Sequence, residues 1–186
     1  MSRIRIVDPQ TAPAPAKSLL DAVQAQLGVT PNFIRVLANS PKALEGFLGL
    51  YGAAAGFALD KATQERIALA VAEGNACQYC VSAHTAIGRH AGLSNDEMTL
   101  NRRGGSGQAR AAAVVAFAKS LNDNRGEVTT AEFEAARAAG LTDGEIVEVI
   151  AAVALNVFTN ILGKATRVDI DFPTVELLGP AMKNAA

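Results

Sequence analysis

Two cysteines and one histidine are the side chains of this sequence best suited to chemistry. Cys77 and Cys80 are the only two cysteines among 186 residues, and they stand at Cys-x-x-Cys spacing. His84 follows the second cysteine by four residues, which on a helix is one turn along the same face. A pair of thiols with an acid/base partner one turn away indicates thiol–disulfide chemistry.

A helix is predicted to begin just before the cysteine pair. Asn75 is a suitable N-cap, and Gln78 follows three residues later, as a capping box requires. Cys77 and Cys80 would then lie in the first turns of the helix, where unpaired backbone N–H groups favour a thiolate. Because residues three apart share a helix face, only a modest adjustment would close a disulfide.

A carboxylate on the preceding helix is the fourth candidate. A helix is predicted from about Lys61 to Glu73, and Gly74-Asn75 interrupts it. If the chain reverses there, Glu65, nine residues before Gly74, comes level with His84, nine residues after Asn75. We therefore expect a line from Glu65 through His84 to Cys80, which holds the imidazole in one tautomer and lets it carry a proton.

Two structural alternatives stay open for this cluster. The cysteines could be packing residues in an alanine-rich core. Cys77, Cys80, His84 and His90 could also bind zinc, although Cys77 to His90 spans roughly 20 Å along one helix. We interpret His90 as a helix-end histidine favoured by the helix dipole. Tyr79 is interpreted as a packing residue whose phenol could reach the site.

The remainder of the sequence predicts a single all-α domain. Apolar residues recur at helical spacing from residue 16 onward, and no stretch shows the period-two alternation of a strand. Residues 1–15 contain prolines that favour extended backbone, so we expect an extended arm there. Residues 16–173 would form the domain, and residues 174–186 a C-terminal tail.

Local signals place several further features. Ser94, Thr129 and Thr142 are each followed three residues later by Glu, which predicts three capping boxes. Residues 102–107, Arg-Arg-Gly-Gly-Ser-Gly, are interpreted as a flexible, solvated linker. Most of the larger aromatic residues are expected to fill the core. These residues are Phe47, Tyr51, Phe117, Phe133 and Phe158.

The longest apolar stretch, residues 146–162, is interpreted as a buried helix. It carries Glu148, Asn156 and Asn160, and it is too short and too polar for a comfortable membrane span. The two asparagines stand one turn apart, and buried amides need partners. We expect them either to bond to each other's backbone or to line a pocket.

The bulk composition excludes several classes of partner. Seventeen basic and 18 acidic residues give a net charge of −1, so neither nucleic acid nor an anionic membrane is expected to bind. The first eight residues contain no apolar signal core, and we expect a cytoplasmic protein. In that compartment a single Cys-x-x-Cys is not expected to act as a structural staple.

The pattern Glu65-x11-Cys77-x-Tyr79-Cys80-x3-His84 resembles the signature of the AhpD-like alkylhydroperoxidases, within the carboxymuconolactone decarboxylase superfamily. The similarity is closest to the branch of peroxidase-related enzymes, and it extends more weakly through residues 155–160 and 168–173. The resemblance implies an all-helical fold that assembles as a trimer or a hexamer. It also implies reduction of a small peroxide by an external thiol reductant, without haem, flavin or metal.

The resemblance further implies a role for each candidate residue. Cys80 attacks the peroxide and becomes a sulfenic acid, and Cys77 condenses with it to a disulfide. His84 and Glu65 carry the proton that activates Cys80 and protonates the departing alkoxide. The best-described members have a histidine immediately before the second cysteine, where this chain has Tyr79.

Two other functions stay open at this point. The first is a decarboxylase-like lyase of the same superfamily, although such members generally lack the cysteine pair. The second is a non-enzymatic thiol redox sensor, in which the disulfide changes oligomerisation.

Overall fold

The computed structural model describes residues 1–179, which fold into nine helices without a β-strand among them. This result confirms the predicted all-α class. The helices are α1 (Ala14–Leu27), α2 (Asn32–Leu37), α3 (Pro41–Ala54), α4 (Lys61–Gly74), α5 (Gln78–His90), α6 (Asn95–Arg102), α7 (Ala109–Asp123), α8 (Thr130–Ala138) and α9 (Asp143–Thr166).

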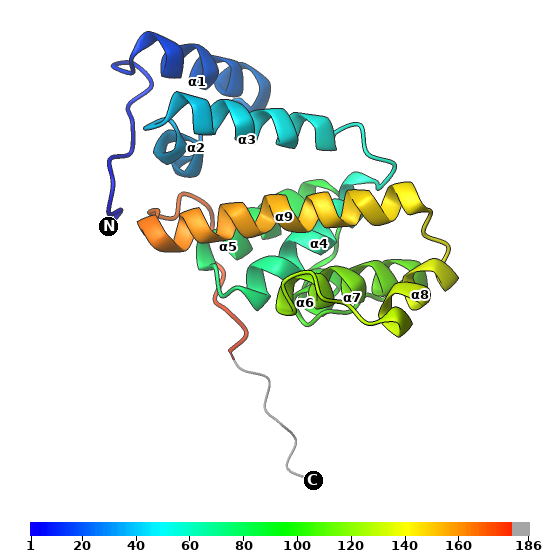
Figure 1. The fold of residues 1–186 in the computed structure, drawn as a ribbon. Helices are drawn as coiled ribbons and strands as arrows, with labels where there is room; N and C mark the ends of the chain where they lie inside the picture. Colours follow the sequence, from blue (N-terminus) through cyan, green and yellow to red (C-terminus); the bar gives the residue numbers. More distant parts are fainter. Residues whose placement is uncertain (180–186) are drawn as a thin grey trace.

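Helix α4 lies at the centre of the fold and packs against α5, α6, α7 and α9. All six residues from Ile67 to Ala72 on α4 are buried, so the helix is enclosed on nearly every side. Small alanines alternate with large apolar residues in this stretch, which lets several helices approach closely. Figure 1 shows α9 crossing the molecule between α1–α3 on one side and α6–α8 on the other.

The N-terminal helices begin at prolines. Pro13 is the N-cap of α1 and Pro15 lies in its first turn, so the helix starts within the last two residues of the predicted arm. Pro31 is the N-cap of α2, and Pro41 is the first residue of α3 after the N-cap Ser40. The division into arm, domain and tail stays a prediction, and residues 180–186 of that tail lie outside the described residues.

Two of the three predicted capping boxes are confirmed. Thr129 and Thr142 each accept a hydrogen bond from the backbone of the glutamate three residues on, whose side chain returns the bond. Ser94 accepts from the Glu97 backbone, but the Glu97 side chain does not return to it. That carboxylate accepts hydrogen bonds from Ser106 and Gly107 instead, so the interpretation of this loop as a flexible, solvated linker is wrong.

The Glu97 carboxylate should make the stability of the fold sensitive to acid. Burial opposes its charge, but hydrogen bonds from Ser106, Gly107 and Arg66 outweigh burial and lower its pKa from 4.5 to about 2. Because the folded pKa lies below the unfolded one, the stabilisation is complete above 4.5 and is lost as pH falls toward 2. Allowing for solvent screening, we expect Glu97→Gln to cost about 2 kcal/mol of unfolding free energy near neutral pH.

Urea denaturation at neutral and at acidic pH checks this expectation. The difference between the native protein and Glu97→Gln should shrink as the pH falls below 4.5, because the native carboxylate then becomes neutral as well. An equal difference at both pH values would assign the effect to packing rather than to charge.

Helix α9 is buried along one face only. Its inner face includes Ile146, Val149 and Gly163, whereas Val147 is 64% and Ile161 is 62% exposed on the outside. The prediction of a buried helix is therefore wrong for the outer face. Among the described helices, α9 alone is long and apolar enough to span a membrane, with a mean hydropathy of 1.9. That is weak evidence for a span, because core helices of soluble proteins pass the same test.

Candidate active site

The turn that carries the cysteines differs from the predicted one. The backbone N–H of Asn75 donates to Val71, so this residue ends α4 and does not begin α5. Ala76 then takes a left-handed conformation with φ of 50°, and Cys77 is the N-cap of α5. The predicted capping box from Asn75 to Gln78 is therefore wrong. Gln78 donates its side-chain amide to Glu176.

Cys77 and Cys80 form a disulfide at the start of α5, with their Cα atoms 5.3 Å apart. Cys77 is 1% exposed and Cys80 is 3% exposed. The backbone N–H of Cys80 donates to Cys77 Sγ over 3.3 Å, which places the first sulfur at the N-terminus of the helix. This position favours a thiolate at Cys77 when the disulfide is reduced.

Gly163 of α9 provides the space in which the two sulfurs lie. A Cβ atom at this position would lie 3.3 Å from Cys77 Sγ and 3.7 Å from Cys80 Sγ. Gly163 is a component of the site that sequence reasoning missed. Its role depends on how α9 packs against α5, and an isolated glycine in a helical pattern does not signal such a contact.

Gly163→Ala is expected to make the disulfide harder to reduce. Two separate sulfurs need more room than two bonded ones, so a methyl group at this position penalises the reduced form more than the oxidised form. The equilibrium constant with dithiothreitol should shift toward the disulfide by about fivefold, which corresponds to about 1 kcal/mol. Gly49→Ala is the matched control, because a Cβ atom there meets no atom within 4 Å. An unchanged constant in Gly163→Ala would contradict the expectation.

The hairpin of α4 and α5 brings Glu65 and His84 together, as predicted. His84 Nδ1 lies 2.7 Å from Glu65 Oε2, and Lys61 Nζ lies 2.7 Å from the other carboxylate oxygen. A carboxylate can only accept, so the proton lies on Nδ1 and leaves His84 Nε2 available for chemistry. A pairing of Glu65 with Lys61, four residues earlier on the same helix face, is the contact that i,i+4 spacing favours, but the carboxylate is buried and not exposed as such a pair usually is.

The Glu65 side chain is only 3% exposed, yet the surrounding charges keep it ionised. Burial alone would raise its pKa. The charges of His84 and Lys61 and their hydrogen bonds outweigh burial, and the pKa of Glu65 falls below its usual value. The site therefore holds an ionised carboxylate between the histidine and Lys61.

An apolar cavity of about 320 Å³ reaches this cluster from the side of α1–α3. Cys80, His84 and Glu65 line it, whereas Cys77 does not. Most of the other residues that line it are aromatic or aliphatic. They include Phe33, Ile34, Phe47, Leu48, Tyr51 and Phe172. A molecule in this cavity would meet the second cysteine and the histidine together.

The cavity changes the interpretation of the aromatic residues. Phe47 and Tyr51 line it, so they are not simply core residues. Phe117 and Phe133 do pack against each other in the core, with ring centroids 5.8 Å apart. Phe158 is 41% exposed on the outer face of α9, so the core prediction is wrong for it.

Tyr79 anchors the segment that follows α9. Its hydroxyl donates to Asp171 Oδ1 over 2.9 Å and accepts from the backbone N–H of Phe33. Burial and the Asp171 charge raise the pKa of Tyr79 far above its usual range, so the phenol stays neutral. The residue packs between Phe33 and Phe172 and also lines the cavity, which agrees with its interpretation as a packing residue.

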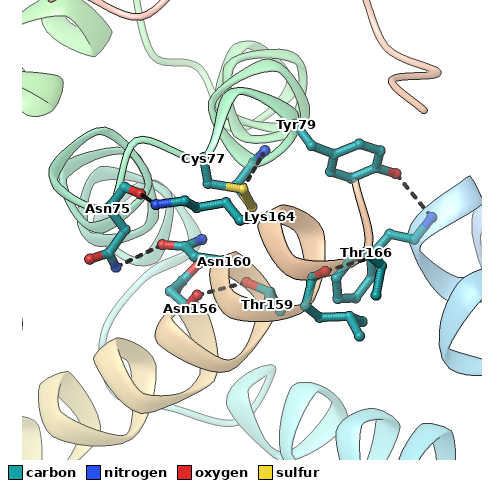
Figure 2. Close-up of a disulfide and its surroundings, with 11 residues drawn as sticks. Asn75, Cys77, Tyr79, Asn156, Thr159, Asn160, Lys164 and Thr166 are labelled. Carbon is teal, nitrogen blue, oxygen red and sulfur yellow. Dashed lines mark hydrogen bonds between the residues drawn. A yellow bond between two sulfur atoms is a disulfide. The ribbon is translucent and has the colours of Figure 1, made fainter. Parts of the chain in front are cut away.

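The two asparagines of α9 have different environments (Figure 2). Asn156 donates to the backbone carbonyl of Ala152 and lines the cavity. Asn160 accepts from the side chain of Asn75 and lines a separate pocket with Asn75, Asn122 and Lys164, so both asparagines line a pocket, one of the two expected arrangements. His90 bonds to the Ala86 carbonyl at the end of α5. Within residues 1–179, no three His, Cys, Asp or Glu side chains come close enough together to hold a metal ion.

Comparison with known proteins agrees with this arrangement. The profile of the carboxymuconolactone decarboxylase family matches residues 41–120, which include both cysteines, Glu65 and His84. No curated protein matches the chain significantly in sequence.

Solved structures match almost the whole chain. An uncharacterized peroxidase-related protein from Ralstonia eutropha JMP134, described as an alkylhydroperoxidase AhpD core, is 27% identical, with a TM-score of 0.81 over 91% of this chain and 92% of that one. A peroxidase-related protein from Silicibacter sp. TM1040 is 24% identical, with a TM-score of 0.80 over 96% and 94% of the two chains. The debrominase Bmp8, solved with 2,3,4-tribromopyrrole, shares the fold at 18% identity, with a TM-score of 0.77 over 92% and 94%.

Proposed function

The chain belongs to the AhpD-like proteins of the carboxymuconolactone decarboxylase superfamily, and we propose that it is a thiol-dependent reductase of alkyl hydroperoxides. One observation carries the proposal. Cys80 opens onto an apolar cavity beside His84 while it is bonded to the enclosed Cys77. A peroxide that carries an apolar group can therefore meet the attacking sulfur and a proton carrier at the same time.

The first step oxidises Cys80. His84 Nε2 takes the thiol proton, and the Cys80 thiolate attacks the peroxide oxygen that bears hydrogen. The O–O bond breaks, Cys80 becomes a sulfenic acid, and the departing alkoxide takes its proton from the imidazolium. Glu65 holds Nδ1–H and stabilises the charge that the imidazole carries between the two transfers.

The second step closes the disulfide and returns the protein to its starting state. The Cys77 thiolate attacks the sulfenic sulfur of Cys80, and the hydroxide leaves as water after it takes a proton. An external thiol reductant then supplies two electrons and two protons to the disulfide and leaves oxidised. No metal, haem or flavin enters this scheme.

A homo-oligomer, either a trimer or a hexamer, is part of the proposal. The outer face of α9 supports it, because Val147, Ile150, Phe158 and Ile161 are all exposed there. Burying such a face against a second copy is the usual way for a soluble protein to remove it from water.

A second candidate reaction is the reductive removal of bromine from an aromatic compound. The cavity next to Cys80 also favours this debromination, because many of the side chains that line it are aromatic. The fold shared with Bmp8 supports only the architecture, so this reaction ranks below peroxide reduction.

One experiment separates these reactions. Fully reduced protein receives one equivalent of cumene hydroperoxide or of 2,3,4-tribromopyrrole, and free thiols, bromide and the cysteine products are then measured. Rapid loss of both thiols with peroxide, and a Cys77–Cys80 disulfide in the mass spectrum, would support the proposed function. Thiols that survive peroxide would reject it, and bromide release in that case would support the second candidate.

A further inference from the structure

Asn160 carries a buried hydrogen-bond donor that has no partner among the described residues. The residue is 1% exposed, and its Oδ1 atom accepts from Asn75 Nδ2 over 2.9 Å. Its own Nδ2 makes no hydrogen bond within residues 1–179. A buried amide N–H without an acceptor costs free energy, so its presence calls for an explanation.

The position of Asn160 relates this donor to the disulfide. Gly163 stands three residues further along α9, on the same helix face, and it lies against both sulfurs. Asn75, which holds the Asn160 oxygen, is two residues before Cys77. Figure 2 shows the Asn160 amide with its oxygen toward Asn75 and its nitrogen turned away from it, below Lys164 and Cys77.

We propose that Asn160 is a positioning residue that donates through Nδ2 to the Cys77 thiolate when the disulfide opens. The inference rests on the proposed function, because it requires Cys77 and Cys80 to cycle between the disulfide and the dithiol. In the disulfide the Asn160 amide nitrogen makes no hydrogen bond within the described residues, and a neutral sulfur is a weak acceptor. A thiolate carries a full charge, and a hydrogen bond to it is stronger than one to a neutral group.

The donor would act on the leaving group during reduction. Cys80 lines the cavity and Cys77 does not, so an external dithiol attacks Cys80 Sγ. The S–S bond then breaks, and its electron pair goes to Cys77. Cys77 leaves as a thiolate, and the reductant is held in a mixed disulfide with Cys80. The second thiol of the reductant then displaces Cys80, which takes a proton, and the reductant departs as a disulfide.

Other groups around Cys77 act on the thiolate in different ways. The first turn of α5 donates the Cys80 N–H, and Lys164 of α9 holds its ammonium 2.6 Å from the Asn75 carbonyl. The Glu65–His84 pair lies on the cavity side of the disulfide, and Tyr79 stays neutral. The Asn160 amide does not titrate, so its contribution does not change with its own protonation.

Thiolate formation at Cys77 tests the proposal without any peroxide. In a Cys80→Ser background, the ultraviolet absorbance of the thiolate gives the pH at which half of Cys77 is ionised. Asn160→Asp keeps the oxygen that Asn75 needs but replaces the donor with a carboxylate oxygen, and Asn160→Leu removes both groups. The midpoint should rise by about one pH unit in Asn160→Leu, and further in Asn160→Asp.

Reduction of the disulfide in the two-cysteine protein provides the second readout. The rate with dithiothreitol should fall about tenfold in both Asn160 variants, because the leaving thiolate loses its donor. Asn122→Leu is the control. Asn122 also bonds to the Asn75 side chain, so this variant disturbs the same turn while it leaves the Asn160 amide in place. Its midpoint and rate should match those of the native protein.

The outcomes are distinct. Unchanged midpoints of Cys77 ionisation in folded Asn160→Leu and Asn160→Asp proteins would overturn the inference. An equal shift in Asn122→Leu would also overturn it, because the effect would then belong to the Asn75 turn. A shift confined to the Asn160 variants supports it. Failure of the native protein to consume peroxide would reject the proposed function alone, because neither readout uses peroxide.

Discussion

Cys80→Ser is expected to reduce peroxide consumption to the uncatalysed background, whereas Cys77→Ser should keep a single turnover. The difference follows from the cavity, which Cys80 lines and from which Cys77 is excluded. A serine hydroxyl at position 80 is not nucleophilic enough to attack a peroxide, so no oxidised enzyme forms. A serine at position 77 leaves the attack intact and removes only the thiol that resolves the sulfenic acid.

Two measurements distinguish the cysteines. Steady-state consumption of cumene hydroperoxide with excess dithiothreitol reports full cycling, and trapping of sulfenic acid with dimedone reports the first step alone. Cys77→Ser should give one equivalent of trapped product, and Cys80→Ser should give none. Ser82→Ala on the same helix is the matched control, because Ser82 bonds to the backbone of Val175 and not to the cysteines. Retained turnover in Cys80→Ser would show that the cavity-facing sulfur is not the attacking atom.

The roles assigned to the cysteines could be predicted only in part from local sequence. The Cys-x-x-Cys spacing and the following helix establish that the two sulfurs meet, and that feature is local. The predicted start of the helix is wrong by two residues, because asparagine caps the end of one helix as readily as the start of the next. Ala76, in the left-handed region, allows the reversal at a position where glycine is the usual choice.

The contact between Glu65 and His84 could be predicted, because residues that stand equally far from a tight helical hairpin turn lie side by side. Both residues stand nearly the same number of positions from the turn, so an error of one or two residues in its location still leaves them level. Gly163 and Asn160 had no comparable signal. They come to the site through the packing of α9, some eighty residues later in the chain, and helical periodicity does not tell which neighbour a buried face will meet.

The apolar cavity shows the same limit. Phe47 and Tyr51 lie on a regular apolar stripe of α3, and the pattern of such a stripe is identical whether it faces packed side chains or an empty space. Phe158 follows the helical period of α9 but lies on its outer face, where 41% of the residue is exposed. Periodicity identifies an apolar face, and only the complete fold decides what covers that face.

The Glu65–His84 pair provides the second large expected effect. We expect Glu65→Gln and His84→Gln each to lower the rate of Cys80 oxidation by about 10² to 10⁴-fold, the usual contribution of a positioned proton carrier. The glutamine at position 65 can still accept from His84 Nδ1–H but lacks the charge that stabilises an imidazolium. The glutamine at position 84 keeps Glu65 paired with Lys61 and removes the proton carrier itself.

Stability measurements separate charge from packing in the Glu65 variant. The pKa of Glu65 is lowered in the folded state, so its charge contributes stability above its usual pKa of 4.5, and this stability is lost as the pH falls below that value. Glu65→Gln should therefore differ from the native protein near neutral pH and approach it in acid. His90→Gln, at the exposed end of α5, should change neither the rate nor this pH dependence.

The double variant decides whether the two residues act as one unit. If Glu65 acts only through His84, the rate of Glu65→Gln combined with His84→Gln should equal that of His84→Gln alone, since the carboxylate then has no imidazole to hold. Rapid mixing of each reduced variant with cumene hydroperoxide, followed by loss of free thiol, measures the four rates. Multiplicative losses would mean that Glu65 and His84 act on Cys80 separately. A 2.7 Å contact between a buried carboxylate and a half-buried imidazole predicts that the carboxylate acts only when the imidazole is present.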